Sequence, residues 1–87
     1  MAWKVEYTAR AKKSLRKLDK QTALRIVDYM DNLPENPRDQ GKGLVGNLAG
    51  YWRYRVGNYR VLTKLEDEKL LVLVVEAGHR RNIYGGH

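Results

Sequence analysis

Three arginines lie in a segment that is predicted to form a β-hairpin, and their spacing brings their side chains to one face. The dipeptide Gly57-Asn58 is typical of a two-residue hairpin turn, because both residues accept positive φ angles. With that turn, Arg55 lies opposite Arg60, and Arg53 points to the same side because side chains alternate along a strand. Opposed like charges destabilise a hairpin by about 0.2–1 kcal/mol. The pair therefore indicates a phosphate-binding face, unless Glu6 or another acid of the first strand neutralises the arginines.

A second group of polar residues follows the last predicted strand, within residues 77–84. Arg80 is always protonated, so it can stabilise negative charge that develops on a phosphate group but cannot act as a base. Histidine is the side chain most often used to transfer protons near neutral pH, so His79 is a candidate proton donor to a leaving oxygen, and it could equally be a structural hinge residue. Tyr84 could stack on a base or donate its phenolic proton. Together with the hairpin arginines, this group predicts a catalytic site.

The distribution of charge indicates an anionic partner. The chain has 17 Lys and Arg against 10 Asp and Glu, which gives a formal net charge of +7. Clustered cations release counterions from a phosphate backbone, so nucleic acid is the commonest partner of such a surface, although charge alone fits a merely soluble basic protein equally well. The candidate RNA-binding residues, four of them on the polar face of a predicted helix, are Lys12, Lys13, Arg16, Lys17 and Arg81.

The rest of the chain supplies the elements that position these residues. Residues 3–7 alternate between apolar and charged side chains and predict a half-buried strand. Thr8 is typical of a helix N-cap, and apolar residues at helical spacing predict a helix after it and a second helix that Pro34 stops. A glycine-rich loop follows over residues 36–50. The strands predicted after this loop are 51–56, 59–65 and 70–75.

This order of elements predicts an α+β fold in a single domain over residues 1–87. We expect a small antiparallel sheet packed against an N-terminal helical hairpin, in the order β-α-α-β-β-β. Six consecutive apolar residues occupy positions 70–75. Such a run is typical of a strand covered on both faces, so we expect this strand at the centre of the sheet.

Several classes of site and location are excluded by composition. The chain has no cysteine, which removes disulfides, thiolate nucleophiles and thiolate zinc sites, and its two histidines cannot complete a structural metal site alone. We therefore expect no metal and no cofactor. No apolar run approaches the roughly 20 residues of a membrane span, so we expect a cytoplasmic protein without a membrane partner.

Two motifs carry a resemblance to a known family. Residues 50–61 read Gly-Tyr-Trp-Arg-Tyr-Arg-Val-Gly-Asn-Tyr-Arg-Val, and residues 78–84 read Gly-His-Arg-Arg-Asn-Ile-Tyr. With the order of elements, they resemble the RelE/ParE superfamily of bacterial toxin–antitoxin toxins over essentially the whole chain. The second motif is more similar to the RelE branch. The resemblance therefore implies the RelE-like fold and a toxin of the RelE type.

The resemblance also implies an activity and partners. RelE-branch toxins are endoribonucleases that enter the ribosomal A site and cut mRNA there without a metal. The ribose 2′-hydroxyl attacks its own phosphate and leaves a cyclic phosphate, which stops translation and arrests growth. The implied partners are a cognate antitoxin, the ribosome and its mRNA, and operator DNA only through the antitoxin complex.

The family's catalytic positions fall on residues already singled out. Its basic strand residues match Arg53, Arg55 and Arg60, and the arginine and tyrosine of the last motif match Arg80 and Tyr84. The founding toxin has lysines at the first two positions. A lysine crowded by cations can lose its proton and act as a base, whereas an arginine effectively cannot. The general base is thus left open between Tyr84, Glu76, a ribosomal RNA group and no protein base at all.

Two alternatives share the fold. A ParE-like toxin would poison gyrase by binding it and would need no ribonuclease chemistry, but the presence of Arg60, Arg80 and Tyr84 argues against it. A non-catalytic member of the fold would bind RNA with the same residues and leave it intact. Cleavage of mRNA on programmed ribosomes separates these readings.

Overall fold

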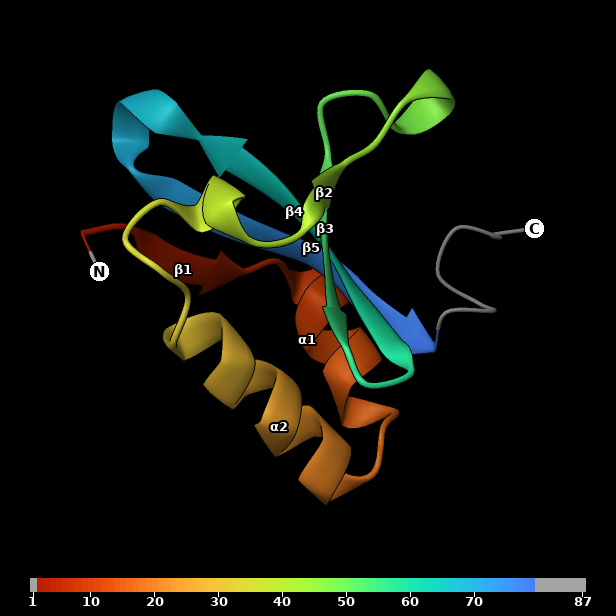
Figure 1. The fold of residues 1–87 in the computed structure, drawn as a ribbon. Coiled ribbons are helices and arrows are strands. Elements are labelled where there is room, and N and C mark those ends of the chain that lie inside the picture. The colour runs from red at the N-terminus through yellow and green to blue at the C-terminus, as the bar shows by residue number, and fades with distance from the viewer. Residues whose placement is uncertain (1, 80–87) are drawn as a thin grey trace.

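The computed structural model describes residues 2–79 and places two helices against one face of a sheet (Figure 1). The predicted α+β fold class is confirmed, and the predicted helical hairpin follows the first strand. The sheet of the described part has five strands in the spatial order β1-β5-β4-β3-β2. The helices and strands are β1 (Lys4–Tyr7), α1 (Ala9–Arg16), α2 (Lys20–Asp31), β2 (Lys42–Gly43), β3 (Trp52–Val56), β4 (Tyr59–Glu66) and β5 (Leu71–His79).

Side-chain caps fix where both helices begin. The Thr8 hydroxyl accepts a hydrogen bond from the Ala11 backbone N–H at 3.0 Å, which confirms the predicted N-cap of α1. Asp19 caps α2 by accepting from the Thr22 N–H at 3.2 Å. This bond and the hydroxyl of Thr22 hold the pKa of the Asp19 carboxyl below its usual value. The Asp19 cap begins α2 only a few residues after α1 ends at Arg16, so a short turn joins the two helices into the hairpin.

One sheet contact differs from the expected antiparallel arrangement. β1 pairs with β5 in parallel, with Val5 beside Val72 and Tyr7 beside Val74, so the sheet is mixed. More than sixty residues separate the two strands, and a long connection, unlike a hairpin turn, does not force neighbouring strands to run antiparallel. The parallel register places the apolar side chains of β1 on the face that the helices cover.

The last strand is also placed differently from the prediction. β4 occupies the centre of the sheet, while β5 lies between β1 and β4. Val72 and Val74 are fully buried against the helices, but Leu71, Leu73 and Val75 are only half-buried. The expectation of a central strand covered on both faces was therefore wrong, because the described residues cover just one face of the sheet.

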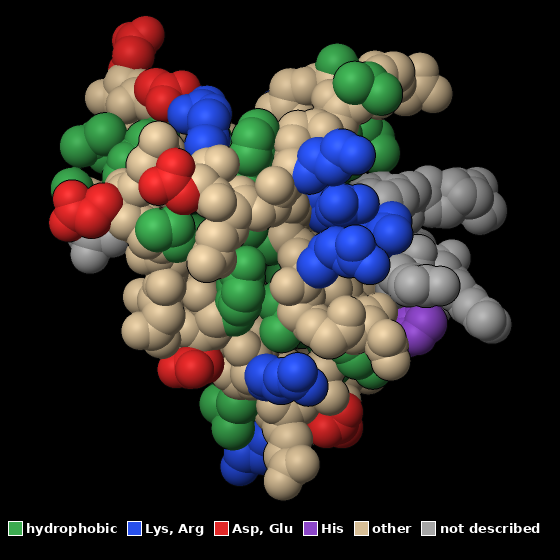
Figure 2. Space-filling model, viewed as in Figure 1, with side chains coloured by type: hydrophobic (Ala, Val, Ile, Leu, Met, Phe, Trp, Pro, Cys, Tyr) green, Lys and Arg blue, Asp and Glu red, His purple; other side chains and the backbone are tan. Residues whose placement is uncertain are grey.

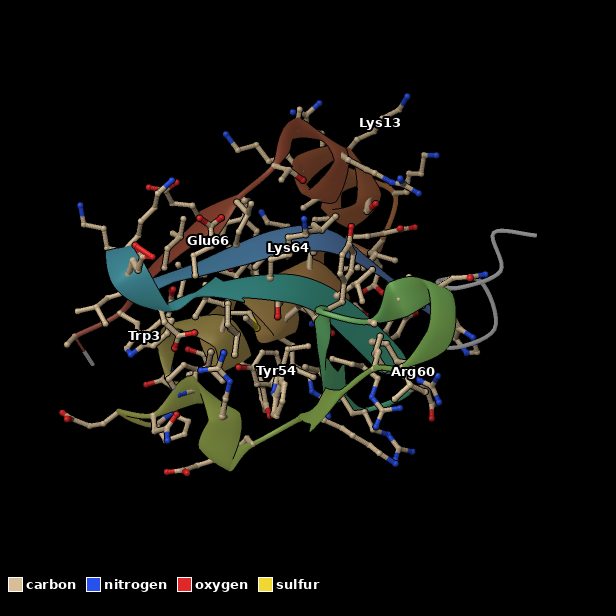
Figure 3. The ribbon with its side chains drawn as sticks, turned by 90° about the horizontal axis from the view of Figure 1, so that it is seen from above. Trp3, Lys13, Tyr54, Arg60, Lys64 and Glu66 are labelled. Atoms are coloured by element: carbon tan, nitrogen blue, oxygen red, sulfur yellow. The ribbon has the colours of Figure 1, made fainter. Side chains whose placement is uncertain are left out.

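The core explains why both helices lie on the same side. Ala11 of α1 and Ile26 and Met30 of α2 form one buried cluster with side chains of β3, β4 and β5. Figure 3 shows α2 behind the strands, with Tyr54 between the sheet and the α2 side of the molecule. The opposite sheet face carries polar side chains such as Lys64 together with the apolar Leu62, Leu71 and Leu73. Within residues 2–79, the structure contains no helix that is long and apolar enough to cross a membrane.

Candidate nucleic-acid interface

The predicted hairpin register is confirmed residue by residue. β3 and β4 are antiparallel around Gly57-Asn58, with Arg55 directly opposite Arg60 and Arg53 opposite Leu62. These side chains lie on the open face of the sheet, because Tyr54 and Val61, which alternate with them, are buried beneath the helices. Figure 2 shows Lys and Arg side chains gathered over the β2–β3 side of the molecule, with acidic side chains mostly elsewhere. The structure thus brings the three hairpin arginines together.

The surroundings of the hairpin arginines suit an anion. Arg53 is half-buried, and its Nε atom has no hydrogen-bond partner among the described residues. A buried donor without a partner costs about 1–3 kcal/mol, which an oxygen of a bound phosphate would recover. Gly78 lies opposite Arg60 on β5, and among the described residues, apart from its two chain neighbours, no heavy atom lies within 4 Å of a Cβ atom added to it. The described residues therefore leave room beside Gly78, on the face from which Arg60 projects.

The alternative in which Glu6 neutralises the arginines does not fit the topology. β1 is an edge strand. β5 lies between it and β4, which carries Arg60, and both β5 and β4 lie between it and β3, which carries Arg53 and Arg55. Glu76 is nearer to the arginines than Glu6, since it faces Leu62 across the β4–β5 ladder. Its Oε1 atom, however, forms an ion pair with Arg10 Nη2 at 3.0 Å. Glu6, the acid of the first strand, thus lies at an outer edge of the sheet and not on a strand next to an arginine.

A network of polar contacts anchors the loop that precedes β2. The Trp52 indole donates to the Gln40 carbonyl at 2.8 Å, and the Tyr29 hydroxyl bonds to Gln40 Oε1 at 2.9 Å. The buried Tyr54 hydroxyl donates to the Pro37 carbonyl at 2.7 Å, and burial raises the pKa of Tyr54. These bonds attach the chain between α2 and β2 to the hairpin.

β2 is a short strand within the glycine-rich loop and was missed by the sequence analysis. It pairs Lys42 with Arg53 and Gly43 with Trp52. Gly41 has a φ of +80°, and a Cβ atom there would lie 2.5 Å from the Arg53 carbonyl oxygen. Only glycine therefore lets the loop approach β3 this closely. The flanking glycines Gly41 and Gly43 were the available signal for this close approach, but two residues are too few to show strand periodicity.

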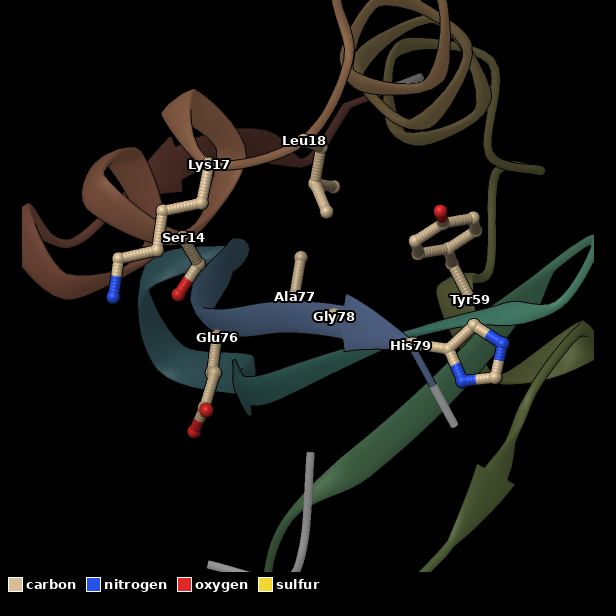
Figure 4. A pocket seen from close by; sticks show the side chains of 8 residues that line it. All are labelled: Ser14, Lys17, Leu18, Tyr59, Glu76, Ala77, Gly78 and His79. Atoms are coloured by element: carbon tan, nitrogen blue, oxygen red, sulfur yellow. The ribbon is translucent and has the colours of Figure 1, made fainter. Parts of the chain in front are cut away.

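His79 lies on the other face of the sheet from the hairpin arginines. It is the last residue of β5 and pairs with Tyr59, with the two rings edge to face at 5.6 Å between centroids. Both rings line a pocket of about 480 Å³ near the end of α1. Figure 4 shows the two rings and the Ser14 side chain, which also lines this pocket. His79 and the hairpin arginines therefore lie on different surfaces, although His79 directly follows Gly78, which faces Arg60.

The basic residues predicted on the first helix are exposed, as expected for its polar face. Lys12, Lys13, Arg16 and Lys17 all lie on or directly after α1. In Figure 3, Lys13 is on the α1 side of the molecule and Arg60 is on the β2–β3 side, so these cations form a second basic surface. Arg80, Arg81 and Tyr84 fall outside the described residues. Within residues 2–79, no three His, Cys, Asp or Glu side chains form a group that could hold a metal ion.

The chain is similar to known proteins over most of its length. The family model described as ParE toxin of the type II toxin–antitoxin system parDE matches residues 5–84. Toxin RelG of Mycobacterium tuberculosis is 33% identical over 85 residues, covering 97% of this chain and 98% of that protein.

Solved structures show the same likeness. A chain of the Mycobacterium tuberculosis toxin–antitoxin complex RelBE2 has a TM-score of 0.83 and 31% identity, with 92% of this chain and 93% of that chain covered. The isolated Escherichia coli RelE toxin has a TM-score of 0.74 and 25% identity, with 98% and 94% covered. The resemblance therefore extends over nearly the whole length of each protein.

Proposed function

Because this chain belongs to the RelE/ParE superfamily of type II toxin–antitoxin toxins, we propose that it is a ribosome-dependent endoribonuclease that cleaves mRNA in the A site. The observation that carries the proposal is the opposed pair Arg55 and Arg60, with Arg53 beside it on an open sheet face. A fold keeps opposed cations most readily where an anion lies between them. The scissile phosphate of mRNA is that anion.

The proposed reaction is a transesterification within the RNA. The ribose 2′-oxygen attacks the adjacent phosphorus while the bond from phosphorus to the 5′-oxygen breaks, which leaves a 2′,3′-cyclic phosphate and a 5′-hydroxyl. Arg53 and Arg60 neutralise the charge that accumulates on the phosphate oxygens, a form of electrostatic stabilisation that needs no proton transfer by an arginine. Arg80 adds a further guanidinium. The same charges favour ionisation of the attacking 2′-hydroxyl.

Tyr84 and His79 are the two residues that the sequence offers for proton transfer in this reaction. We expect Tyr84 mainly to stack on a base, and we expect the arginines to supply most of the stabilisation. His79 is the candidate donor to the leaving 5′-oxygen. Because it lies on the other face of the sheet from the arginines, beside Tyr59, this role requires it to reach the phosphate around the end of β5. The 2′-hydroxyl proton then leaves to Tyr84, Glu76, a ribosomal RNA group or water.

The proposed partners follow from the same family membership. The similar chain of RelBE2 was solved in a toxin–antitoxin complex, which supports a cognate antitoxin for this chain. We propose that the antitoxin binds this toxin and prevents entry into the ribosome, and that contact with operator DNA occurs only through the antitoxin complex. The exposed cations of α1 and Arg81 would contact ribosomal RNA, and the reaction would need no metal or other cofactor.

Cleavage of mRNA on purified ribosomes tests the proposal directly. The purified protein is mixed with ribosomes that hold a defined mRNA and an empty A site, and the 3′ ends of the fragments are mapped. We expect cuts within the A-site codon and cyclic phosphate ends. Intact mRNA after prolonged incubation with folded wild-type protein would contradict the proposal.

A second candidate function has one observation in its favour, the match to a family model named after the ParE toxin. A ParE-like toxin would bind gyrase and leave mRNA intact. Gyrase assays on supercoiled plasmid separate the two, because trapped double-strand breaks without mRNA cleavage would support this candidate. Binding of RNA with neither activity would indicate a non-catalytic member of the fold.

A further inference from the structure

Lys42 lies on the same surface as the hairpin arginines, although the chain places it in a glycine-rich loop. It is the direct partner of Arg53 across the β2–β3 ladder, so both side chains leave the sheet on its open face. Two opposed cation pairs therefore stand side by side, Lys42 with Arg53 and Arg55 with Arg60. We call these four residues the cation row.

We propose that Lys42 is a further RNA-binding residue, which contacts a backbone phosphate next to the one held by the hairpin arginines. This inference rests on the proposed ribonuclease function and adds a residue to its substrate site. The cation row crosses three neighbouring strands and spans about 12 Å from Arg60 to Lys42, given ordinary strand spacing. That length exceeds a single phosphate group, so the row suits a stretch of single-stranded backbone.

Several cations among the described residues already have an acidic or aromatic partner. Arg10 pairs with Glu76, Arg38 with Asp67 and Lys69 with Glu66. The Lys64 ammonium lies over the Tyr51 ring at 5.2 Å from its centroid. No described residue forms a hydrogen bond or ion pair with the exposed Lys42 ammonium, so this charge is available to a ligand.

The position of Lys42 is also unusually well fixed for a loop residue. Gly41 lies against the backbone of Arg53, and Gln40 is held by the Trp52 indole and the Tyr29 hydroxyl. The backbone of Lys42 is thus attached to β3, although its side chain reaches into solvent. A cation on a fixed backbone loses less entropy when it binds a phosphate than one on a free loop.

The test compares two lysines at opposite edges of the same sheet. Lys42→Gln removes the proposed contact, Lys42→Arg keeps its charge, and Lys4→Gln is the matched control on the edge strand β1. Affinity is measured at several salt concentrations on ribosomes programmed with an mRNA that carries a 2′-deoxyribose at the reacting position. Single-turnover cleavage is measured in parallel with the all-ribose mRNA at saturating protein.

We expect Lys42→Gln to weaken binding roughly threefold to tenfold and to lower the salt slope by about 0.7–1, as for one lost phosphate contact. Lys42→Arg should bind like wild type, and the saturated cleavage rate should change far less than affinity. Equal affinities of Lys42→Gln and Lys4→Gln, or a loss confined to the saturated rate, would overturn the inference.

The two proposals fail in different ways. If wild type cleaves mRNA but Lys42→Gln matches the Lys4→Gln control, the assignment of Lys42 is wrong and the ribonuclease function stands. If wild type binds programmed ribosomes but leaves the all-ribose mRNA intact, the ribonuclease function is wrong, and the affinities of the variants still judge Lys42. A wild-type protein that binds no ribosomes overturns both.

Discussion

Arg60 is the residue at which the structural and functional demands of the hairpin conflict most clearly. It faces another arginine, Arg55, on β3, and it faces Gly78, which has no side chain, on β5. Opposed cations lower the stability of the hairpin slightly, and that cost is offset if both side chains bind a phosphate in the transition state. The same two residues should therefore contribute little to folding and much to the reaction.

We predict that Arg60→Ala reduces single-turnover cleavage on ribosomes by about 30- to 1000-fold. This corresponds to about 2–4 kcal/mol of lost transition-state stabilisation, the usual effect of removing one charge-stabilising donor. Growth arrest on expression should disappear. Thermal unfolding serves as the control for the fold, and a folded Arg60→Ala protein that cleaves near the wild-type rate would rule out this role.

Tyr7 is a residue whose polar atom the fold does not satisfy. Its hydroxyl is buried without a hydrogen-bond partner among the described residues, and burial followed by the charge of Asp31 raises the pKa of Tyr7 to about 12. A raised pKa means that the folded state favours the neutral phenol. The stability that this preference contributes to the folded state is fully present below about pH 10 and is lost as the pH rises towards 12.

We predict that Tyr7→Phe is as stable as wild type at pH 7 or more stable by up to about 1 kcal/mol, because it removes an unsatisfied hydroxyl but keeps the ring. Between pH 10 and 12 it should also lose less stability than wild type. Urea unfolding at pH 7, 10 and 12 measures both effects. A clear loss of stability at pH 7 would show that the hydroxyl has a favourable interaction in the native state.

Among the elements, the hairpin could be predicted closely and β2 could not. Gly57-Asn58 allows one two-residue turn, and that turn alone determines the register of Arg55 and Arg60. β2 is held instead by contacts from residues distant in sequence, such as the bond from Trp52 to Gln40. Its pairing depends on tertiary structure, which local patterns do not encode.

The face on which His79 lies was unpredictable for a different reason. The β4–β5 ladder shifts register at Leu62/Thr63, so that Val75 of β5 is an extra residue between two paired positions. This bulge reverses the alternation, and residues after it point opposite to the simple pattern. Ala77 is buried as a result, and His79 joins it on the helix-facing side. A single bulge thus separates His79 from the arginines.

The attachment of β2 can be tested with two glycines that both have positive φ angles. Gly41→Ala combines backbone strain with a Cβ atom 2.5 Å from the Arg53 carbonyl oxygen, whereas a Cβ atom added at Gly46 meets no atom of the described residues within 4 Å. We predict that Gly46→Ala costs about 1 kcal/mol, the penalty of the left-handed conformation alone. Gly41→Ala should cost at least about 2–3 kcal/mol.

Urea unfolding of the two glycine variants measures this difference. The affinity of Gly41→Ala for programmed ribosomes should also fall, because Lys42 loses its fixed position beside Arg53. Equal stabilities of the two variants would mean that the loop moves aside easily, and β2 would then be a weak element.

At the scale of the whole molecule, two groups of cations lie on different sides of the protein. The cation row occupies the open face at the β2–β3 side, while the exposed cations of α1 lie on another side of the molecule (Figures 2 and 3). Acidic residues of α2 and of the β4–β5 turn lie elsewhere, as the segregation of charge in the chain suggested. A large polyanion such as ribosomal RNA can contact both surfaces, whereas a short strand binds to one of them.

This division predicts different effects of α1 on two RNA partners. Replacing Lys12, Lys13, Arg16 and Lys17 by glutamine should weaken ribosome binding and flatten its salt dependence, because up to four phosphate contacts are lost. Binding of a short single-stranded oligoribonucleotide should change much less, since the cation row is intact. Saturated cleavage on ribosomes should also stay near the wild-type rate, because these residues lie away from the arginines. A parallel fall in oligoribonucleotide affinity would show instead that the two basic surfaces act as one site, and unchanged ribosome affinity would make the α1 cations an ordinary solvated surface.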